Sequence, residues 1–326
     1  MNKVGILGGG VWGSALAKLL SDHEVIIYAR DTKVVDSINK NGINPNLKYT
    51  ILGKNVGSSS DLSDLMDVDY LFVALPVQSI REVFTKYKDK NKNQKIILAS
   101  KGIEISTKLF QKDMIKALIE SDNISVLSGP CFSDEVAQNL PTAVTLASSS
   151  KKIFEEINLL FNNRNFRLYY TDDFIGCQIG GALKNIYAIA AGITNALNLG
   201  ENAKSALITR SFVEISRFSK NLGGNPNTVF GLSGLGDLIL TCNSLKSRNT
   251  NFGHIIASSQ KISIQDHLKS QQTTEGYYTV KAVKEIAEEK KIDMPIMLSI
   301  YNILHKGASI DKEINSLLGR SSKEEF

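Results

Sequence analysis

The sequence is poor in the residues that build disulfide frameworks and metal sites. Its 326 residues include three cysteines and four histidines. Cys131, Cys177 and Cys242 lie far apart and are odd in number, so they predict neither a disulfide framework nor a CxxC metal pair. The histidines show no HxxxH or HxH spacing, and we therefore expect a protein without a metal cofactor.

Long apolar runs are also missing. A membrane-spanning helix needs about 18 consecutive apolar residues, and none of that kind occurs. The N-terminal Met-Asn-Lys leads into a short strand pattern instead of a secretory signal, which favours the cytoplasm. The net charge of +5, from 38 basic and 33 acidic residues, is a mild excess without basic runs interleaved with aromatic residues. A nucleic-acid partner and membrane insertion are therefore not expected.

The first half of the chain alternates two kinds of segment. Short runs rich in Val, Ile and Leu alternate with helix-like stretches, which is typical of an α/β fold with a mainly parallel sheet covered by helices on both faces. We assign this pattern to a first domain of residues 1–171. The expected strands are Val4–Leu7, Glu24–Ala29, Asp69–Leu75, Lys95–Ser100, Ile124–Ser128 and Thr142–Ala147. The expected helices are Val11–Leu20, Ser79–Tyr87, Thr107–Ile119 and Ser133–Asn139.

The second half has no strand-like runs. Pro295 in the first turn and Gly307 just past the end mark the last of its long amphipathic stretches as a helix. The pattern predicts an all-α C-terminal domain over residues 172–326. Its expected helices are Phe174–Leu197, Ala203–Leu222, Arg248–Ser258, Gly276–Lys291 and Pro295–His305.

A glycine-rich turn follows the first expected strand. Gly8, Gly10 and Gly13 form the pattern GxGxxG between a strand and a helix, the context in which it predicts a dinucleotide-binding domain of Rossmann type. Gly8 would permit the tight turn, Gly10 the approach of the pyrophosphate, and Gly13 close helix–strand packing, while the helix N-terminus supplies free N–H groups. Trp12, the only tryptophan, lies inside this turn, where either core packing or stacking on the cofactor is open.

The end of the second expected strand bears on which dinucleotide binds. About 20 residues after the first glycine, an NAD site usually offers an acidic side chain to the ribose 2′-hydroxyl. Here Arg30 and then Asp31 follow the strand. An arginine there can bind a 2′-phosphate, which favours NADP(H), whereas Asp31 keeps NAD(H) open. Arg30 could equally be a solvated residue at the strand end.

One lysine interrupts the most apolar helix of the second half. Lys184 lies in Phe174–Leu197, which is apolar almost all the way round and should be buried on most faces. Gly176, Gly180 and Ala188 share its line at i, i+4 spacing and leave room for another backbone or a ligand. Desolvation lowers the pKa of an ammonium group toward the working range of a general acid or base. Lys184 is therefore a candidate catalytic residue, and the alternative is a lysine that extends to solvent.

Two polar clusters follow this helix in the sequence. Asp237 comes after a glycine-rich turn and enters an apolar run, so it could pair with the buried lysine, receive a substrate hydroxyl or cap a helix. Ser247, Arg248 and Asn249 open the next expected helix. An arginine beside hydroxyl and amide donors at a helix N-terminus suits a phosphate group, although a plain serine cap is the alternative.

Two turns of the first half lie at strand ends. Lys101 follows one expected strand, and a turn beginning with Ser128 and Gly129 follows the next. Ligands of such sheets bind outside the carboxyl ends of the strands. Both turns are therefore expected at the binding crevice, although either could be a solvated loop.

Eight ordered blocks of the sequence carry a family resemblance. They are GGGVWGSALA, LPVQSIREV, SKGIE, SGPCFSDEVA, GGALKNIYAIAAGI, GLSGLGDLILTC, SRNTNFG and TTEGYYT. With these blocks the chain resembles bacterial-type NAD(P)-dependent glycerol-3-phosphate dehydrogenase across essentially its whole length. Together they are far more specific than the glycine pattern alone.

The resemblance implies an activity and a set of site residues. The activity is the reduction of dihydroxyacetone phosphate to sn-glycerol 3-phosphate with NADP(H) or NAD(H), for glycerophospholipid synthesis, with Lys184 as general acid/base. The implied substrate contacts are Lys101, Gly129, Cys131, Lys184, Asp237, Ser247, Arg248 and Asn249. The implied cofactor contacts, beside Gly8, Gly10 and Gly13, are Val11, Trp12, Arg30, Lys101, Ser133, Arg248, Thr273 and Glu275.

Three of these positions depart from the family's pattern. Cys131 stands where the family usually carries a hydroxyl side chain, which bears on substrate hydrogen bonding. Val11 and Ser133 replace commoner small residues, and their contacts are expected from the backbone. None of the three is the presumed acid/base or part of the phosphate clamp.

Two other functions are weighed against this one. A related two-domain dehydrogenase acting on another hydroxy acid or sugar would have no use for a phosphate clamp around Arg248. A non-catalytic dinucleotide-binding redox sensor would tolerate Lys184→Ala. As for partners, a small phosphorylated substrate is expected, and the exposed faces of the helical domain could support a homodimer.

Overall fold

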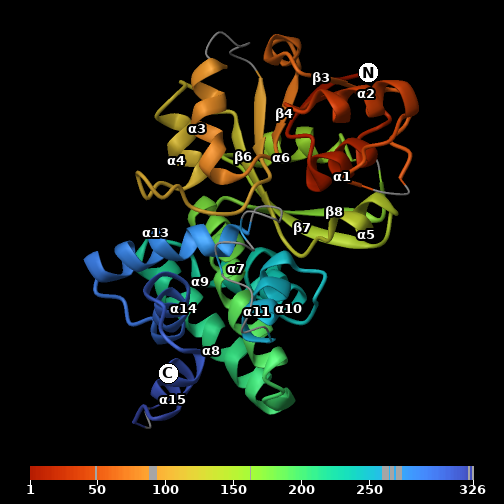
Figure 1. The fold of residues 1–326 in the computed structure, drawn as a ribbon. Coiled ribbons are helices and arrows are strands. Elements are labelled where there is room, and N and C mark those ends of the chain that lie inside the picture. The colour runs from red at the N-terminus through yellow and green to blue at the C-terminus, as the bar shows by residue number, and fades with distance from the viewer. Residues whose placement is uncertain are drawn as a thin grey trace.

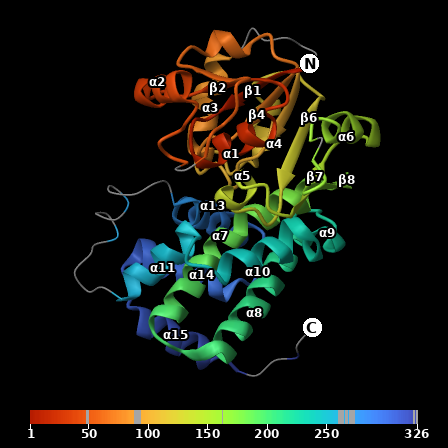
Figure 2. The same cartoon turned by 90° about the vertical axis from the view of Figure 1, so that its right-hand side faces the viewer.

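An α/β unit and a helical unit are stacked end to end (Figures 1 and 2). A computed structural model describes residues 1–47, 50–87, 94–161, 163–258, 264, 268, 274–321 and 324. Across these ranges, no helix combines the length and apolar character that crossing a bilayer requires.

One sheet organises the α/β unit. Over the described residues it has eight strands in the order β3-β2-β1-β4-β5-β6-β7-β8. Neighbouring strands run parallel except β6 and β7, which are antiparallel. The carboxyl ends of β1, β4, β5 and β6 therefore share one edge, where ligands of open α/β sheets bind. The strands are β1 (Lys3–Leu7), β2 (Glu24–Tyr28), β3 (Val56–Ser59), β4 (Tyr70–Val73), β5 (Lys95–Leu98), β6 (Ile124–Ser128), β7 (Thr142–Ala147) and β8 (Phe166–Thr171).

Alternate residues of the central strands enter two separate hydrophobic cores. Ile6 and Phe72 pack in the core that is covered by α1, α2, α5 and α6, whereas Leu7 and Val73 pack in the core under α3 and α4. Successive side chains of a strand point to opposite faces, so a strand buried on both faces reads as a continuous apolar run. The helices are α1 (Val11–Leu19), α2 (Thr32–Asn41), α3 (Val77–Lys86), α4 (Gln111–Lys116), α5 (Ser133–Ala137) and α6 (Lys151–Asn158), with a 3-10 turn η1 at Leu62–Leu65.

The helical unit is built around α7 (Phe174–Ala196), in which 20 of the 23 residues are buried. This helix lies at the centre of the unit and reaches up to the sheet (Figure 1), with its start packed against β6 and β7. Its neighbours include α8, α9, α10, α11, α13 and α14. The elements that follow it are α8 (Gly200–Asn221), α9 (Pro226–Phe230), a π-helical turn η2 (Leu232–Gly236), α10 (Asp237–Cys242), α11 (Arg248–Ser258), α13 (Glu275–Glu289), α14 (Pro295–Lys306) and α15 (Ile310–Leu318).

The predicted fold class is confirmed, but several elements differ from those expected. The strands β3 and β8 were not predicted: β3 is a short Val-Gly-Ser-Ser segment, and β8 is an edge strand with alternating burial. The helices α2, α6 and α15 were also not predicted. The helix α4 is shorter than Thr107–Ile119, because residues 103–110 form a turn closed by an Ile103–Phe110 bridge.

The boundary between the units lies in a short connection. The last strand ends at Thr171 and α7 begins at Phe174. The division into residues 1–171 and 172–326 stays a prediction.

Candidate functional site

The glycine turn lies at the carboxyl end of β1. Gly8 has a φ of +128°, and a Cβ at this position would lie 2.7 Å from the Ala74 carbonyl oxygen after β4. A Cβ on Gly13 would lie 1.9 Å from the Gly8 oxygen, so the turn and α1 are in close contact. A Cβ on Gly10 would meet nothing within 4 Å. The α1 N-terminus also has no side-chain cap, so its N–H groups and the open space before them fit a dinucleotide phosphate.

Trp12 links the glycine turn to the end of β5. Its Nε1 donates to the Ala99 carbonyl oxygen at 3.0 Å, and its half-buried ring packs against the core under α1. Of the two roles weighed for this residue, packing is therefore observed. Val11 is likewise half-buried at the start of α1.

The two side chains that bear on dinucleotide choice have different surroundings. Arg30 is exposed after β2. Asp31 caps α2, because its Oδ1 accepts the N–H of Lys33 at 2.9 Å. The Asp31 carboxylate is thus engaged by a helix end while the guanidinium of Arg30 faces solvent. A preference for NADP(H) over NAD(H) stays a prediction.

A buried carboxylate joins two lysines at the contact between the units. Asp237 is completely buried. Lys184 Nζ lies 2.5 Å from Asp237 Oδ1, and Lys101 Nζ lies 2.7 Å from Asp237 Oδ2. Lys184 is 8% exposed, so it does not extend to solvent. The sequence-based pairing of Asp237 with Lys184 is seen, and Lys101 from the other half of the chain joins the pair.

The two lysines have opposite pKa shifts. Burial lowers the pKa of Lys184, and the neighbouring Lys101 ammonium lowers it further, against the attraction of Asp237. Burial also works against the charged form of Lys101, but the Asp237 carboxylate outweighs it and raises the pKa of Lys101. Lys184 therefore gives up a proton more readily than Lys101 does.

The turn after β6 completes this cluster on the sheet side. Lys101 Nζ donates to the Gly129 carbonyl oxygen at 2.8 Å and lies 3.7 Å from Cys131 Sγ. Burial raises the pKa of the Cys131 thiol, so it remains protonated beside the ammonium group. Ser133 is the first residue of α5, which packs against α1.

The Ser247–Asn249 segment opens α11 as expected, with three different roles. Ser247 Oγ accepts the N–H of Thr250 at 3.3 Å, which is a helix-cap bond. Asn249 joins helices, since its Nδ2 donates to Asn185 Oδ1 and its Oδ1 accepts the N–H of Gly276, both at 3.0 Å. Arg248 is exposed.

Glu275 connects α13 to the α/β unit. Its Oε1 accepts the N–H of Val77 at 3.2 Å, at the start of α3. Its buried Oε2 has no hydrogen-bond partner among the described residues. Burial raises the pKa of Glu275 to about 7, against the effects of the Val77 N–H and Arg248. Thr273, the other cofactor contact implied in this segment, lies outside the described residues.

Comparisons with known proteins cover nearly the whole chain. Residues 3–154 match the model for the NAD-dependent glycerol-3-phosphate dehydrogenase N-terminus, and residues 173–315 match that for its C-terminus. Glycerol-3-phosphate dehydrogenase [NAD(P)+] of Erythrobacter litoralis is 38% identical, over 99% of this chain and 98% of the relative. Glycerol-3-phosphate dehydrogenase [NAD(P)+] 1 of Lactobacillus delbrueckii subsp. bulgaricus is 41% identical, over 98% of each chain.

The chain belongs to the NAD-dependent glycerol-3-phosphate dehydrogenase family. The crystal structure of glycerol-3-phosphate dehydrogenase from Coxiella burnetii superposes with a TM-score of 0.92 at 32% identity, covering 98% of this chain and 99% of that chain.

Two residues at the site of this glycerol-3-phosphate dehydrogenase family member were not predicted from its sequence. Thr241 Oγ1 accepts a hydrogen bond from Lys184 Nζ at 2.9 Å. It lies four residues after Asp237 on α10, and that i, i+4 spacing could have indicated a shared face. Asn185 anchors Asn249, but only the tertiary structure brings these two amides together.

Glycines bring the backbone of η2 against α7 beside Lys184. A Cβ on Gly180 would lie 2.3 Å from the Ser233 carbonyl oxygen. The small residues around Lys184 thus accommodate another backbone, one of the two uses expected of them. Because α10 begins at Asp237 directly after η2, this contact brings Asp237 close to α7.

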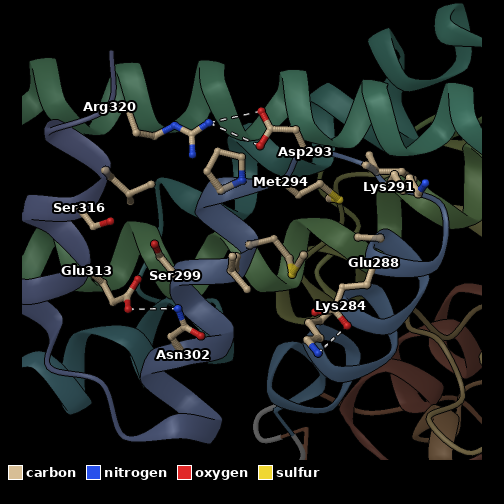
Figure 3. Close-up of a pocket in the computed structure, with 16 residues that line it drawn as sticks. Lys284, Glu288, Lys291, Asp293, Met294, Ser299, Asn302, Glu313, Ser316 and Arg320 are labelled. Atoms are coloured by element: carbon tan, nitrogen blue, oxygen red, sulfur yellow. Dashed lines mark hydrogen bonds and ion pairs between the residues drawn. The ribbon is translucent and has the colours of Figure 1, made fainter. Parts of the chain in front are cut away.

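A separate cavity of about 430 Å³ lies between α13, α14 and α15 (Figure 3). Its rim carries charges of both signs, including the Arg320–Asp293 and Lys284–Glu288 pairs. None of the site residues implied by the dehydrogenase resemblance lines it. The cavity is therefore not part of the candidate active site.

Proposed function

We propose that the Lys184–Asp237–Lys101 cluster is the reaction centre of an NAD(P)-dependent glycerol-3-phosphate dehydrogenase. The chain reduces dihydroxyacetone phosphate to sn-glycerol 3-phosphate, the step that supplies glycerophospholipid synthesis. The observation that carries the location is the meeting of two lysines on one buried carboxylate, at the carboxyl edge of the sheet. This edge also carries the glycine turn.

Lys184 acts as the general acid. The bound dinucleotide supplies the hydride. The lowered pKa of Lys184 favours release of its proton to the substrate carbonyl oxygen. Lys101, whose pKa is raised, stays cationic and stabilises the alkoxide that develops on this oxygen. Asp237 and Thr241 orient the Lys184 ammonium group through their hydrogen bonds.

The phosphate of the substrate is held at the start of α11. Arg248 is exposed and provides a forked cation, and the adjacent helix N-terminus adds partial positive charge. Ser247, Asn249, Gly129 and Cys131 line the same substrate site in this proposal. The exposed position of Arg248 leaves it accessible to an anion arriving from solvent.

The dinucleotide lies across the glycine turn in this proposal. The fit rests on the open space at Gly10 and the uncapped start of α1. Arg30 is assigned to a 2′-phosphate, and the unpartnered Glu275 Oε2 faces the cofactor. The remaining proposed contacts are Gly8, Val11, Trp12, Gly13, Lys101, Ser133, Arg248 and Thr273. A cytoplasmic location and a homodimer complete the proposal.

The two alternatives make different use of these residues. A dehydrogenase for an unphosphorylated hydroxy acid would leave Arg248 without an anionic partner. A dinucleotide sensor without turnover would have no use for a desolvated lysine held by a buried carboxylate. Neither alternative has an observation of its own in its favour.

The test is NADPH oxidation by the purified protein with dihydroxyacetone phosphate. We expect Lys184→Ala to lower kcat by about 10²–10⁴-fold, the range of a lost general acid. Lys220→Ala, at an exposed position on α8, is the matched control and should retain activity. Equal kcat/KM for dihydroxyacetone and its phosphate would exclude the role of Arg248. Dinucleotide binding without reduction would favour the sensor.

A further inference from the structure

The connection between α2 and β3 is hydrogen-bonded to the glycine turn. Asn44 is completely buried, and its Nδ2 donates to the Gly9 carbonyl oxygen at 2.9 Å and to Ser14 Oγ at 2.5 Å. Its Oδ1 accepts the N–H of Asn46 at 2.9 Å. Asn46 Nδ2 donates to the same Gly9 oxygen at 3.3 Å. Both amide hydrogens and the carbonyl oxygen of Asn44 are therefore used, which fixes the orientation of this side chain.

The Gly9 carbonyl determines where the next N–H points. The described peptide bonds are trans, and in a planar trans peptide the C=O and the following N–H point in opposite directions. Asn44 and Asn46 hold the Gly9 oxygen on the side of the α2–β3 connection. The Gly10 N–H therefore points away from that connection.

Packing prevents the turn from relaxing to another conformation. A Cβ on Gly9 would lie 2.5 Å from the Ala29 Cβ, so the turn is pressed against the end of β2. Ser14, which Asn44 also contacts, is buried in α1, and its N–H bonds to the Gly10 carbonyl oxygen at 3.0 Å. Asn44 thus fixes both the glycine turn and the first part of the helix that follows.

We propose that Asn44 is a positioning residue for dinucleotide binding. It holds the Gly9–Gly10 peptide so that the Gly10 N–H and the free N–H groups of α1 face the pyrophosphate. Asn46 assists through its longer bond to the same oxygen. The inference rests on the proposed function, because that function places the dinucleotide on this turn.

The first experiment measures NADPH affinity of Asn44→Asp. Aspartate keeps the shape of the side chain but places a carboxylate oxygen opposite the Gly9 oxygen, which repels the carbonyl instead of holding it. We expect the Kd for NADPH, followed by quenching of Trp12 fluorescence, to rise about tenfold or more. At saturating NADPH, kcat and the KM for dihydroxyacetone phosphate should stay within about twofold, because the substrate site is untouched.

Further variants keep the test informative if Asn44→Asp fails to fold. Asn46→Ala and Ser14→Ala each remove one partner of the network and should raise the Kd for NADPH by about two- to fivefold. Asn39→Ala is the matched control. The exposed Asn39 side chain forms hydrogen bonds to Ser58 of β3 but none to the glycine turn. Its Kd should equal that of wild type.

The outcomes separate this inference from the proposed function. If wild type binds NADPH and every folded variant among Asn44→Asp, Asn46→Ala and Ser14→Ala binds it equally well, Asn44 and its network have only a structural role. If kcat falls with no change in the Kd, the effect on the pyrophosphate is refuted. If wild type itself binds no dinucleotide, the proposed function fails first.

Discussion

Asp237 lies between two ammonium groups in a place that water scarcely reaches. Its side chain has no exposed surface, while those of Lys101 and Lys184 are 15% and 10% exposed. Two like charges at such short range repel strongly when the local dielectric constant is low. The single carboxylate therefore allows both lysines to be present and makes their protonation states interdependent.

Replacing this carboxylate should destabilise the protein strongly. Asp237→Asn removes the negative charge and leaves two buried cations, and we expect the free energy of unfolding to fall by about 3–5 kcal/mol. Urea denaturation measures the loss. Asp293→Asn, on an exposed pair with Arg320, should cost no more than about 1 kcal/mol. Equal effects in the two variants would show that the buried cluster is not held by charge.

A carboxylate also determines how two helices of the second unit meet. Glu214 of α8 is 3% exposed, and its Oε1 and Oε2 accept the N–H groups of Ile296 and Met297 at 2.7 and 3.1 Å. Tyr187 of α7 donates its hydroxyl to Oε2 at 2.9 Å. The first turn of α14 thus obtains its hydrogen-bond acceptors from another helix.

This helix contact should make stability depend on pH. Burial raises the pKa of Glu214 from 4.5 to about 7, against its hydrogen bonds. The folded state therefore holds more protons than the unfolded state between these values, and stability falls as pH rises from about 4.5 to 7, by roughly 3 kcal/mol in total. In Glu214→Gln, urea denaturation profiles should show a fall in stability that is smaller by about this amount, and the remaining fall comes from Glu275, whose pKa is also raised to about 7. Glu288→Gln, at an exposed position, should keep the wild-type slope.

The elements differ in how far the sequence could predict them. The helix around Lys184 was predictable because its apolar residues continue on all sides, and its burial required a partner for the lysine. Pairing of Lys184 with Asp237 was one of several options, and only the packing of η2 on Gly180 selects it. The strand β8 was not predictable because an edge strand needs only one buried face, which leaves a weak hydrophobic pattern in the sequence. The hydrogen bonds of Asn44 to the glycine turn depend on the course of the connection between α2 and β3, which no local residue spacing specifies.

The two units of the molecule also meet at their surface. Lys246, just before the start of α11, lies 3.1 Å from Asp134 Oδ2 and 3.0 Å from Glu135 Oε1 of α5. All three side chains are substantially exposed. Such a contact adds little to stability, but it links the unit that carries Arg248 to the unit that carries the glycine turn.

Reversing this charge should weaken catalysis in a salt-dependent way. Lys246→Glu places three acidic groups together and opposes the approach of the units, so we expect the KM for dihydroxyacetone phosphate to rise about three- to tenfold at low salt. Steady-state kinetics at 0.5 M NaCl, where the Debye length is only about 4 Å, should recover most of the loss. Lys284→Glu, whose partner Glu288 lies on the same helix, should leave KM unchanged. A loss that salt does not relieve would point to a steric cause.

The central position of α7 has a consequence for how the protein is made. Every helix that covers α7 in the second unit comes later in the chain, up to α14. When α7 has just left the ribosome, the helices that pack against this apolar helix have not yet been synthesised. All the strands of the sheet have been synthesised by then, so the sheet can already fold. The lysine cluster can assemble only after α10 has emerged. We expect a nascent chain halted between α7 and α10 to depend on chaperones, while the sheet that precedes α7 in the chain is already folded.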